Sequence, residues 1–95
     1  MATVVGLLHL RFHIPQAQSL KDKRRLVKGF KDRLSSTRNV AVAEVDHLDD
    51  RQQALLAVAM VGNDRQYVEG ALQQVVNAAS QHRDMVLLSR DLEWL

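Results

Sequence analysis

The chain has 95 residues, 46% of them hydrophobic, and it contains no cysteine. This length accommodates one domain with one hydrophobic core, and the composition excludes disulfides, thiolate nucleophiles and sulfur-ligated metals. The first ten residues lack the basic start and long apolar run of a signal peptide, and no apolar stretch is long enough to cross a membrane. We therefore expect one soluble, cytoplasmic domain over residues 1–95.

The formal net charge of +2 conceals an uneven distribution. Between Ser19 and Arg38 there are eight basic and two acidic residues, a net charge of +6. The rest of the chain carries five basic and nine acidic residues, a net charge of −4. A small domain polarised in this way attracts polyanions over distances comparable with the Debye length.

The first third of the chain predicts a strand and a helix. Thr3–His13 is predicted to be a strand that ends before Pro15, because alternate positions place Val4, Leu8, Leu10 and Phe12 on one face and the histidines and Arg11 on the other. Ser19, with Asp22 three residues later, is a pattern typical of a capped helix start. The apolar spacing that follows predicts a helix that ends in the turn-forming run Ser35–Thr37.

The rest of the chain predicts a hairpin, a second helix and a last strand. Arg38–Asp46 and Gln53–Val61 are strand-like and are joined by a short polar turn. Asn63 and Asp64 supply a cap for a helix whose apolar residues recur every three or four positions, and Met85–Leu95 is the final strand. The order β-α-β-β-α-β predicts the ferredoxin-like α+β fold, a four-stranded antiparallel sheet with two helices on one face.

The first helix carries a stripe of basic side chains well away from its apolar face. A surface helix with a purely structural role usually interleaves glutamate with lysine, and this helix has no glutamate. Two lysines also lie in the first turn, where the helix dipole disfavours positive charge. We therefore expect an anion-binding surface, and the alternative is an ordinary solvated face. The residues predicted to contact nucleic-acid phosphates are Lys21, Lys23, Arg24, Arg25, Lys28 and Lys31, with Arg38 at the start of the adjacent strand.

Lys23 differs from the rest of this set, because its angular position lies close to the apolar residues Leu20, Leu26 and Val27. In one interpretation its stem packs against the core and its ammonium group reaches solvent past the helix end. In the other it is a positioned charge beside the free N–H groups of the helix start, a small anion site. The sequence leaves both open.

The first strand places His9, Arg11 and His13 on one side of the sheet. This predicts a polar patch or a site for phosphate or base contacts, without the aromatic side chains on which sheet-binding RNA modules stack bases. The two histidines are ~13 Å apart along the strand, too far to share a metal ion. The acidic turn at residues 46–50 has no ordered ligand spacing, so we expect no metal site there.

Motifs of catalysis are absent from the sequence. There is no phosphate-binding glycine loop, nucleophile elbow or H-E-x-x-H motif, and the segment HIPQAQSL cannot supply the glycine loop and arginine of small ferredoxin-like acylphosphatases. We expect a binding module rather than an enzyme, with no cofactor and no small-molecule substrate. The third strand is apolar on both sides, so the sheet face that the helices leave open predicts a protein-interaction or homodimer surface.

Three segments resemble the bacterial YlxP-like family of short, uncharacterised proteins: VVGLLHLRFHIPQAQSLKDKRRLVKGFKDRL, NVAVAEVDH and VAMVGNDR. The most specific part is Ile14-Pro15 followed by the run SLKDKRR at residues 19–25, and Asn63-Asp64-Arg65 is a second anchor. The resemblance implies a ferredoxin-like fold and genes beside those for translation initiation factor two and ribosome-binding factor A. It implies no catalytic residues. Members often carry a Leu-Trp pair before the third strand, where this chain has Asp50 and Arg51.

The basic helix and the family resemblance lead to the same hypothesis. We expect an RNA- or ribosome-associated module that binds phosphates through its first helix. The alternative is a protein-interaction or homodimerising module that uses the open sheet face.

Overall fold

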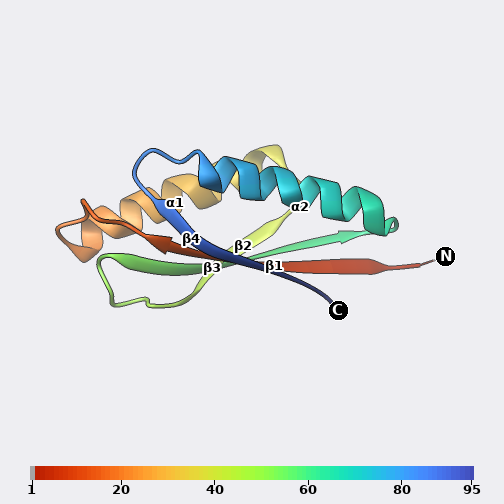
Figure 1. Ribbon diagram of the computed structural model, residues 1–95, viewed down its shortest axis with the longest axis horizontal. Coiled ribbons are helices and arrows are strands. Elements are labelled where there is room, and N and C mark those ends of the chain that lie inside the picture. Colours follow the sequence, from red (N-terminus) through yellow and green to blue (C-terminus); the bar gives the residue numbers. More distant parts are fainter. Residues whose placement is uncertain (1) are drawn as a thin grey trace.

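The computed structural model describes residues 2–95 and shows two layers (Figure 1). Helices α1 (Leu20–Thr37) and α2 (Arg65–Ser80) cover one face of an antiparallel sheet. The sheet has the order β2-β3-β1-β4, and the expected ferredoxin-like α+β arrangement is confirmed. No helix within residues 2–95 is long and apolar enough to cross a membrane. The strands are β1 (Val4–His13), β2 (Ala41–Asp46), β3 (Gln53–Gly62) and β4 (Val86–Trp94).

The core lies between the sheet and the two helices. Alternate residues of the two central strands, β1 and β3, point toward the helices and are buried, as the period of two predicts. Phe12 of β1 meets Phe30 of α1 edge to face, with ring centroids 5.6 Å apart. Gly6 lets α2 approach the sheet closely, because a Cβ atom there would lie 2.8 Å from Leu72.

Both helices begin at the caps that the sequence predicts. The Ser19 hydroxyl accepts a hydrogen bond from the backbone N–H of Asp22 at 3.1 Å, and the Asp22 carboxylate accepts one from the N–H of Gln18 at 3.2 Å. Asp64 caps α2 by accepting from the N–H of Gln66 at 3.1 Å. These side chains satisfy donors that the helix itself leaves unpaired.

Helix α1 ends at Thr37, inside the run Ser35–Thr37 where the sequence predicts its end, whereas the strand that follows begins later than predicted. The helix continues through Thr37, because the hydroxyl groups of Ser36 and Thr37 donate to the Arg33 carbonyl oxygen and are compatible with a last helical turn. Arg38 is the C-cap, with its N–H donating to Leu34, rather than the first residue of a strand. The predicted strand start at Arg38 is therefore wrong, and β2 begins three residues later.

His82 organises the connection between α2 and β4. Its Nδ1 accepts hydrogen bonds from the backbone N–H groups of Asp84 and Met85, at 3.0 and 3.1 Å. The ring packs edge to face on Phe30. Burial and the nearby positive charge of Arg33 lower the pKa of His82, against an opposing effect of Asp84. The neutral imidazole is therefore the form that the folded connection requires.

We expect His82 to make stability depend on mild acid. The unfolded chain takes up this proton near the ordinary pKa of 6.5 and the folded chain only at lower pH, so the free energy of unfolding decreases as pH falls below 6.5. The variant His82→Asn keeps an acceptor near the Nδ1 position and removes the titration. Urea unfolding from pH 7.5 to 5.0 should give a shallower pH dependence for the variant than for the wild type. Equal slopes would show that His82 is not coupled to folding.

Candidate nucleic-acid interface

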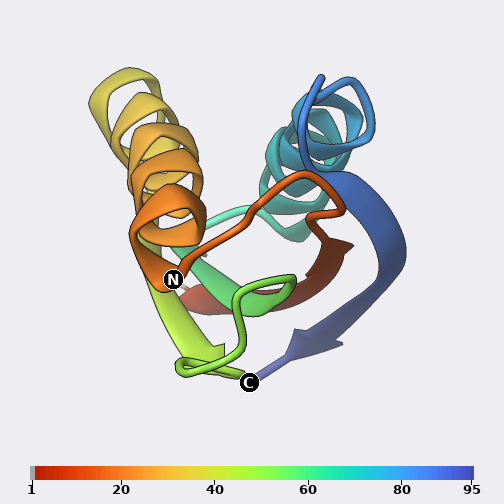
Figure 2. The same cartoon turned by 90° about the vertical axis from the view of Figure 1, so that its left-hand side faces the viewer.

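Helix α1, which carries the predicted basic stripe, lies over the sheet edge formed by β2 (Figure 2). The opposite side of the helix, at Leu26, Gly29 and Arg33, faces α2 across a hollow that also borders Ala78 and His82. The basic side therefore points away from the second helix and into solvent. We call this surface the basic flank; it comprises Lys21, Arg24, Arg25, Lys28 and Lys31.

Two acidic residues partly compensate the basic flank. Asp22 lies 3.5 Å from an Arg25 guanidinium nitrogen, and Asp32 lies 2.5 Å from Lys28 Nζ. Both pairs are exposed, and ion pairs in water stabilise by only ~0–1 kcal/mol, so a phosphate can replace the carboxylate at low energetic cost. The other three cations of the flank form no ion pair within residues 2–95. The flank retains a net positive charge.

Lys23 does not belong to this surface. Its side chain is fully buried, at 0% exposure, and Nζ donates to the Glu44 carboxylate at 2.7 Å. The same nitrogen donates to the carbonyl oxygens of His47 at 2.7 Å and Gln53 at 3.1 Å. An ammonium group has three donors, and all three are occupied. The ammonium group neither reaches solvent nor remains free for an anion, so Lys23 is removed from the predicted contact set.

Glu44 is the residue that the sequence prediction missed. It lies on β2, 21 positions after Lys23, and its carboxylate faces the helices beside the half-buried Val42. The alternation of β2 contains a weak signal, because it places Glu44 and Asp46 on the same side of the strand as Val42. A lysine beside the apolar stripe of the helix is its natural partner, since buried charges are almost always paired.

Arg38 lies at the far end of α1. About 17 helical residues separate it from Lys21, which corresponds to ~25 Å along the axis. Its guanidinium donates to the Thr37 hydroxyl at 3.4 Å, and its buried Nε has no partner within residues 2–95. It borders a separate hollow of about 230 Å³ with Asn39 and Tyr67. The structure therefore does not bring Arg38 together with the cations of the helix start.

The polar residues of β1 lie on the open sheet face, as predicted. Arg11 donates to the Gln53 side chain at 3.2 Å. His9 is opposite Asp91 in the β1–β4 register, and His13 is half-buried at the end of the strand. Together with Asp91 and Ser89 of β4, which pair with His9 and Arg11, these side chains form a polar region of the open face rather than a closed site.

Side chains of the β2–β3 connection hold it in place through one hydrogen bond within the turn and one to the segment before α1. Asp50 accepts a hydrogen bond from the N–H of Gln52 at 2.9 Å, and Arg51 donates to the Gln18 carbonyl oxygen at 3.5 Å. These are the two positions where the family resemblance implies a Leu-Trp pair. In this chain a local turn and a contact to the segment before α1 occupy that place. No group of three or more His, Asp or Glu residues within 2–95 is arranged to hold a metal ion.

The geometry defines a small ferredoxin-like domain with one exposed cationic helix flank. Residues 5–92 match the family described as "Protein of unknown function (DUF503)", and the chain belongs to that family. It is also 30% identical over 73 residues to the "Uncharacterized protein YlxP" of Bacillus subtilis (strain 168), covering 77% of this chain and 79% of that relative. The resemblance to the YlxP-like family is confirmed.

We expect Lys23 to be essential for stability. Lys23→Met leaves a buried carboxylate and two carbonyl oxygens without their donor, so the free energy of unfolding should fall by ~3–5 kcal/mol. Lys21→Met, at an exposed lysine two residues earlier, is the matched control and should change it by less than ~0.5 kcal/mol. Urea denaturation followed by circular dichroism measures both. The double variant Lys23→Met, Glu44→Leu should recover part of the stability that Lys23→Met loses. Similar unfolding midpoints for Lys23→Met and Lys21→Met would contradict this role of Lys23.

Proposed function

We propose that this protein is a non-enzymatic RNA-binding module associated with the ribosome or its assembly. The observation that carries the proposal is the basic flank, a set of five cations on one side of α1, four of them exposed and Lys31 half-buried. The gene neighbourhood implied by the family resemblance, beside translation initiation factor two and ribosome-binding factor A, supports a ribosomal setting. Because Lys23 is buried, it is not counted in the proposed contact surface, and the remaining cations are all accessible to solvent.

The arrangement favours phosphate contacts over base recognition. Residues 21–31 span ~15 Å of helix axis, so the flank can follow several phosphates of one strand. Arg24 and Arg25 offer planar forks for bidentate phosphate contacts, and the lysines offer mobile point charges. No aromatic side chain belongs to the flank, so stacking on bases contributes nothing to binding there. We infer binding that is electrostatic, strongly dependent on salt and tolerant of sequence.

Charge reversal on the flank tests the proposal. The triple variant Arg24→Glu, Arg25→Glu, Lys28→Glu should bind a fluorescein-labelled 20-nucleotide RNA at least ~10-fold more weakly in fluorescence anisotropy. If the wild type neutralises about four phosphates, its log–log salt slope should be about −3 to −4, and the variant slope should be smaller in magnitude. The matched control Arg51→Glu, Arg83→Glu, Arg90→Glu makes the same change in net charge elsewhere and should bind nearly as the wild type.

The same variants test the ribosomal setting. In sucrose gradients of lysate, the wild type should cosediment with ribosomal particles and be released by ribonuclease, and the flank variant should stay at the top. Absence of RNA binding at low salt, or equal loss in the flank and control variants, would overturn the proposal.

A second candidate function follows from the open sheet face. We propose that this face mediates homodimerisation. Apolar or small side chains lie on this face along β2, most of β3 and the first half of β1, the polar residues gather at the other end of β1, and neither helix covers the face (Figure 1). Val61 on this face is 56% exposed. An uncovered apolar sheet face is a common docking surface. Its residues include Val5, Leu7, Ala41, Ala43, Leu55, Ala57, Ala59 and Val61.

Oligomeric state separates this surface from the basic flank. At tens of micromolar, sedimentation equilibrium should give about twice the mass of the 10.8 kDa chain. Leu7→Arg with Ala57→Arg buries unpaired charge in the contact and should give the monomer mass, and the flank variant should remain dimeric. A monomeric wild type would refute homodimerisation and leave the RNA proposal intact.

A further inference from the structure

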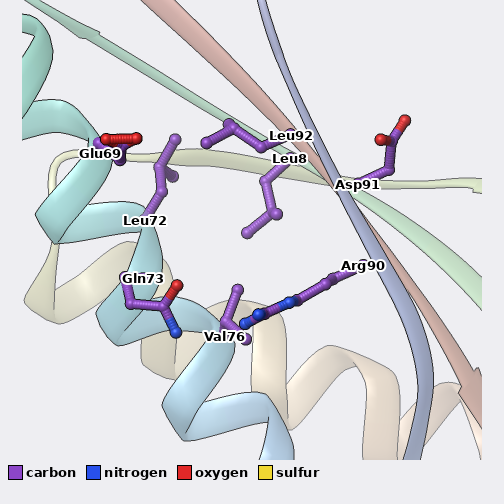
Figure 3. A pocket seen from close by; sticks show the side chains of 8 residues that line it. All are labelled: Leu8, Glu69, Leu72, Gln73, Val76, Arg90, Asp91 and Leu92. Atoms are coloured by element: carbon purple, nitrogen blue, oxygen red, sulfur yellow. The ribbon is translucent and has the colours of Figure 1, made fainter.

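A groove runs between α2 and the edge strand β4, on the side of the molecule opposite the basic flank. It consists of two adjoining hollows of about 280 and 240 Å³, which share Val76 and Arg90. The first has an apolar floor formed by Leu8, Leu72 and Leu92, and Glu69 and Gln73 of α2 line its side away from β4 (Figure 3). The second continues along the strand beside Leu87 and Ser80. We call the two hollows together the edge groove.

Arg90 lies at the centre of the edge groove because the register of β4 on β1 turns its side chain toward the helices. It pairs with Leu10, whose side chain is in the core, so Arg90 points to the helix face of the sheet. Figure 3 shows its side chain extended toward Val76, and the side chain of Asp91 directed away from the groove. Arg90 forms no ion pair within residues 2–95. A guanidinium with five donors over an apolar floor is suited to a carboxylate.

The strand beside the groove is open on one edge. β4 pairs with β1 alone, so its outer backbone groups are available to an added strand. Side chains of such a strand would alternate between the groove and the opposite face. The residue across from Arg90 would meet the guanidinium, and the residues two positions away on either side would enter the two hollows.

We propose that the edge groove binds an extended peptide segment of a partner protein as a fifth strand, with the pattern apolar-x-acidic-x-apolar. The acidic side chain pairs with Arg90, one apolar side chain packs toward Leu92, and the other packs toward Leu87. Backbone hydrogen bonds to β4 supply affinity, and the groove supplies specificity. The pattern is the same in both directions, so it suits a parallel or an antiparallel strand. This partner surface is separate from the RNA-binding proposal.

A second copy of this chain does not satisfy the groove through its own β4. Two-fold antiparallel pairing centred on residue 90 sets Arg90 against Arg90, and centred on 91 sets Asp91 against Asp91. Centred on 92, it sets Asp91 against Glu93. Like charges directly opposite one another destabilise a strand pair. None of these three registers sets a carboxylate across from Arg90. Pairing between the β4 strands of two copies is therefore unfavourable in them, whereas an acidic strand of another protein can pair with Arg90.

The test uses the peptide Ser-Val-Thr-Glu-Thr-Val-Ser, labelled with fluorescein, and a control peptide with lysine in place of glutamate. The full chain should bind the glutamate peptide at least about fivefold more tightly than the lysine peptide in fluorescence anisotropy. Arg90→Glu should reverse this preference, and Arg83→Glu, at a nearby exposed arginine outside the groove, should not. A reversal of preference cannot arise from a folding defect.

Amide chemical shifts of the ¹⁵N-labelled chain locate the contact. The glutamate peptide should perturb residues of β4 and of α2 from 69 to 80. No binding at millimolar peptide, no preference between the peptides, or shifts confined to the open sheet face would each overturn the proposal. Loss of RNA binding in the flank variant does not bear on it, so the two proposals fail independently.

Discussion

The buried ammonium group of Lys23 is the interaction on which the arrangement of this domain depends. It joins the first turn of α1 to Glu44 on β2, to His47 in the following turn and to Gln53 at the start of β3. His47 has a positive φ of 60°, a conformation that costs energy for a non-glycine residue unless its surroundings hold it. One side chain therefore fixes where the helix begins relative to both ends of the hairpin.

This anchor also determines the direction of the basic flank. Lys21, Arg24 and Arg25 follow or precede the anchored residue by one or two positions, so their directions are fixed once Lys23 is fixed. The family-specific run at 19–25 thus combines two roles. Ser19, Asp22 and Lys23 build the helix start, and the remaining cations project into solvent. At Lys23 the Glu44 carboxylate compensates the unfavourable interaction of a positive charge with the helix dipole. Lys21 has no such partner among the described ion pairs.

The fold was predictable because its signals are local. Alternation in β1 and β3, the caps at Ser19 and Asp64 and the apolar spacing of both helices each depend on neighbouring residues. The site was predictable only in part. The partner of Lys23 lies 21 residues away on another element, and a charge count over one helix cannot separate a buried lysine from an exposed one. The edge groove could not be predicted from the sequence for the same reason, since it forms only when α2 packs beside β4.

The strand order gives the domain two edges with different chemistry. The β2 edge lies under the basic flank, where charge is spread along a helix and any polyanion gains from it. The β4 edge carries a single guanidinium between two apolar hollows, where an anion gains only if apolar groups flank it at strand spacing. Salt should therefore weaken binding at the first edge far more than at the second, because screening acts on exposed charges and leaves apolar burial and backbone pairing largely intact. Since two strands, β3 and β1, separate the edges, occupation of one leaves the other accessible, so the proposed RNA and peptide contacts do not compete with each other.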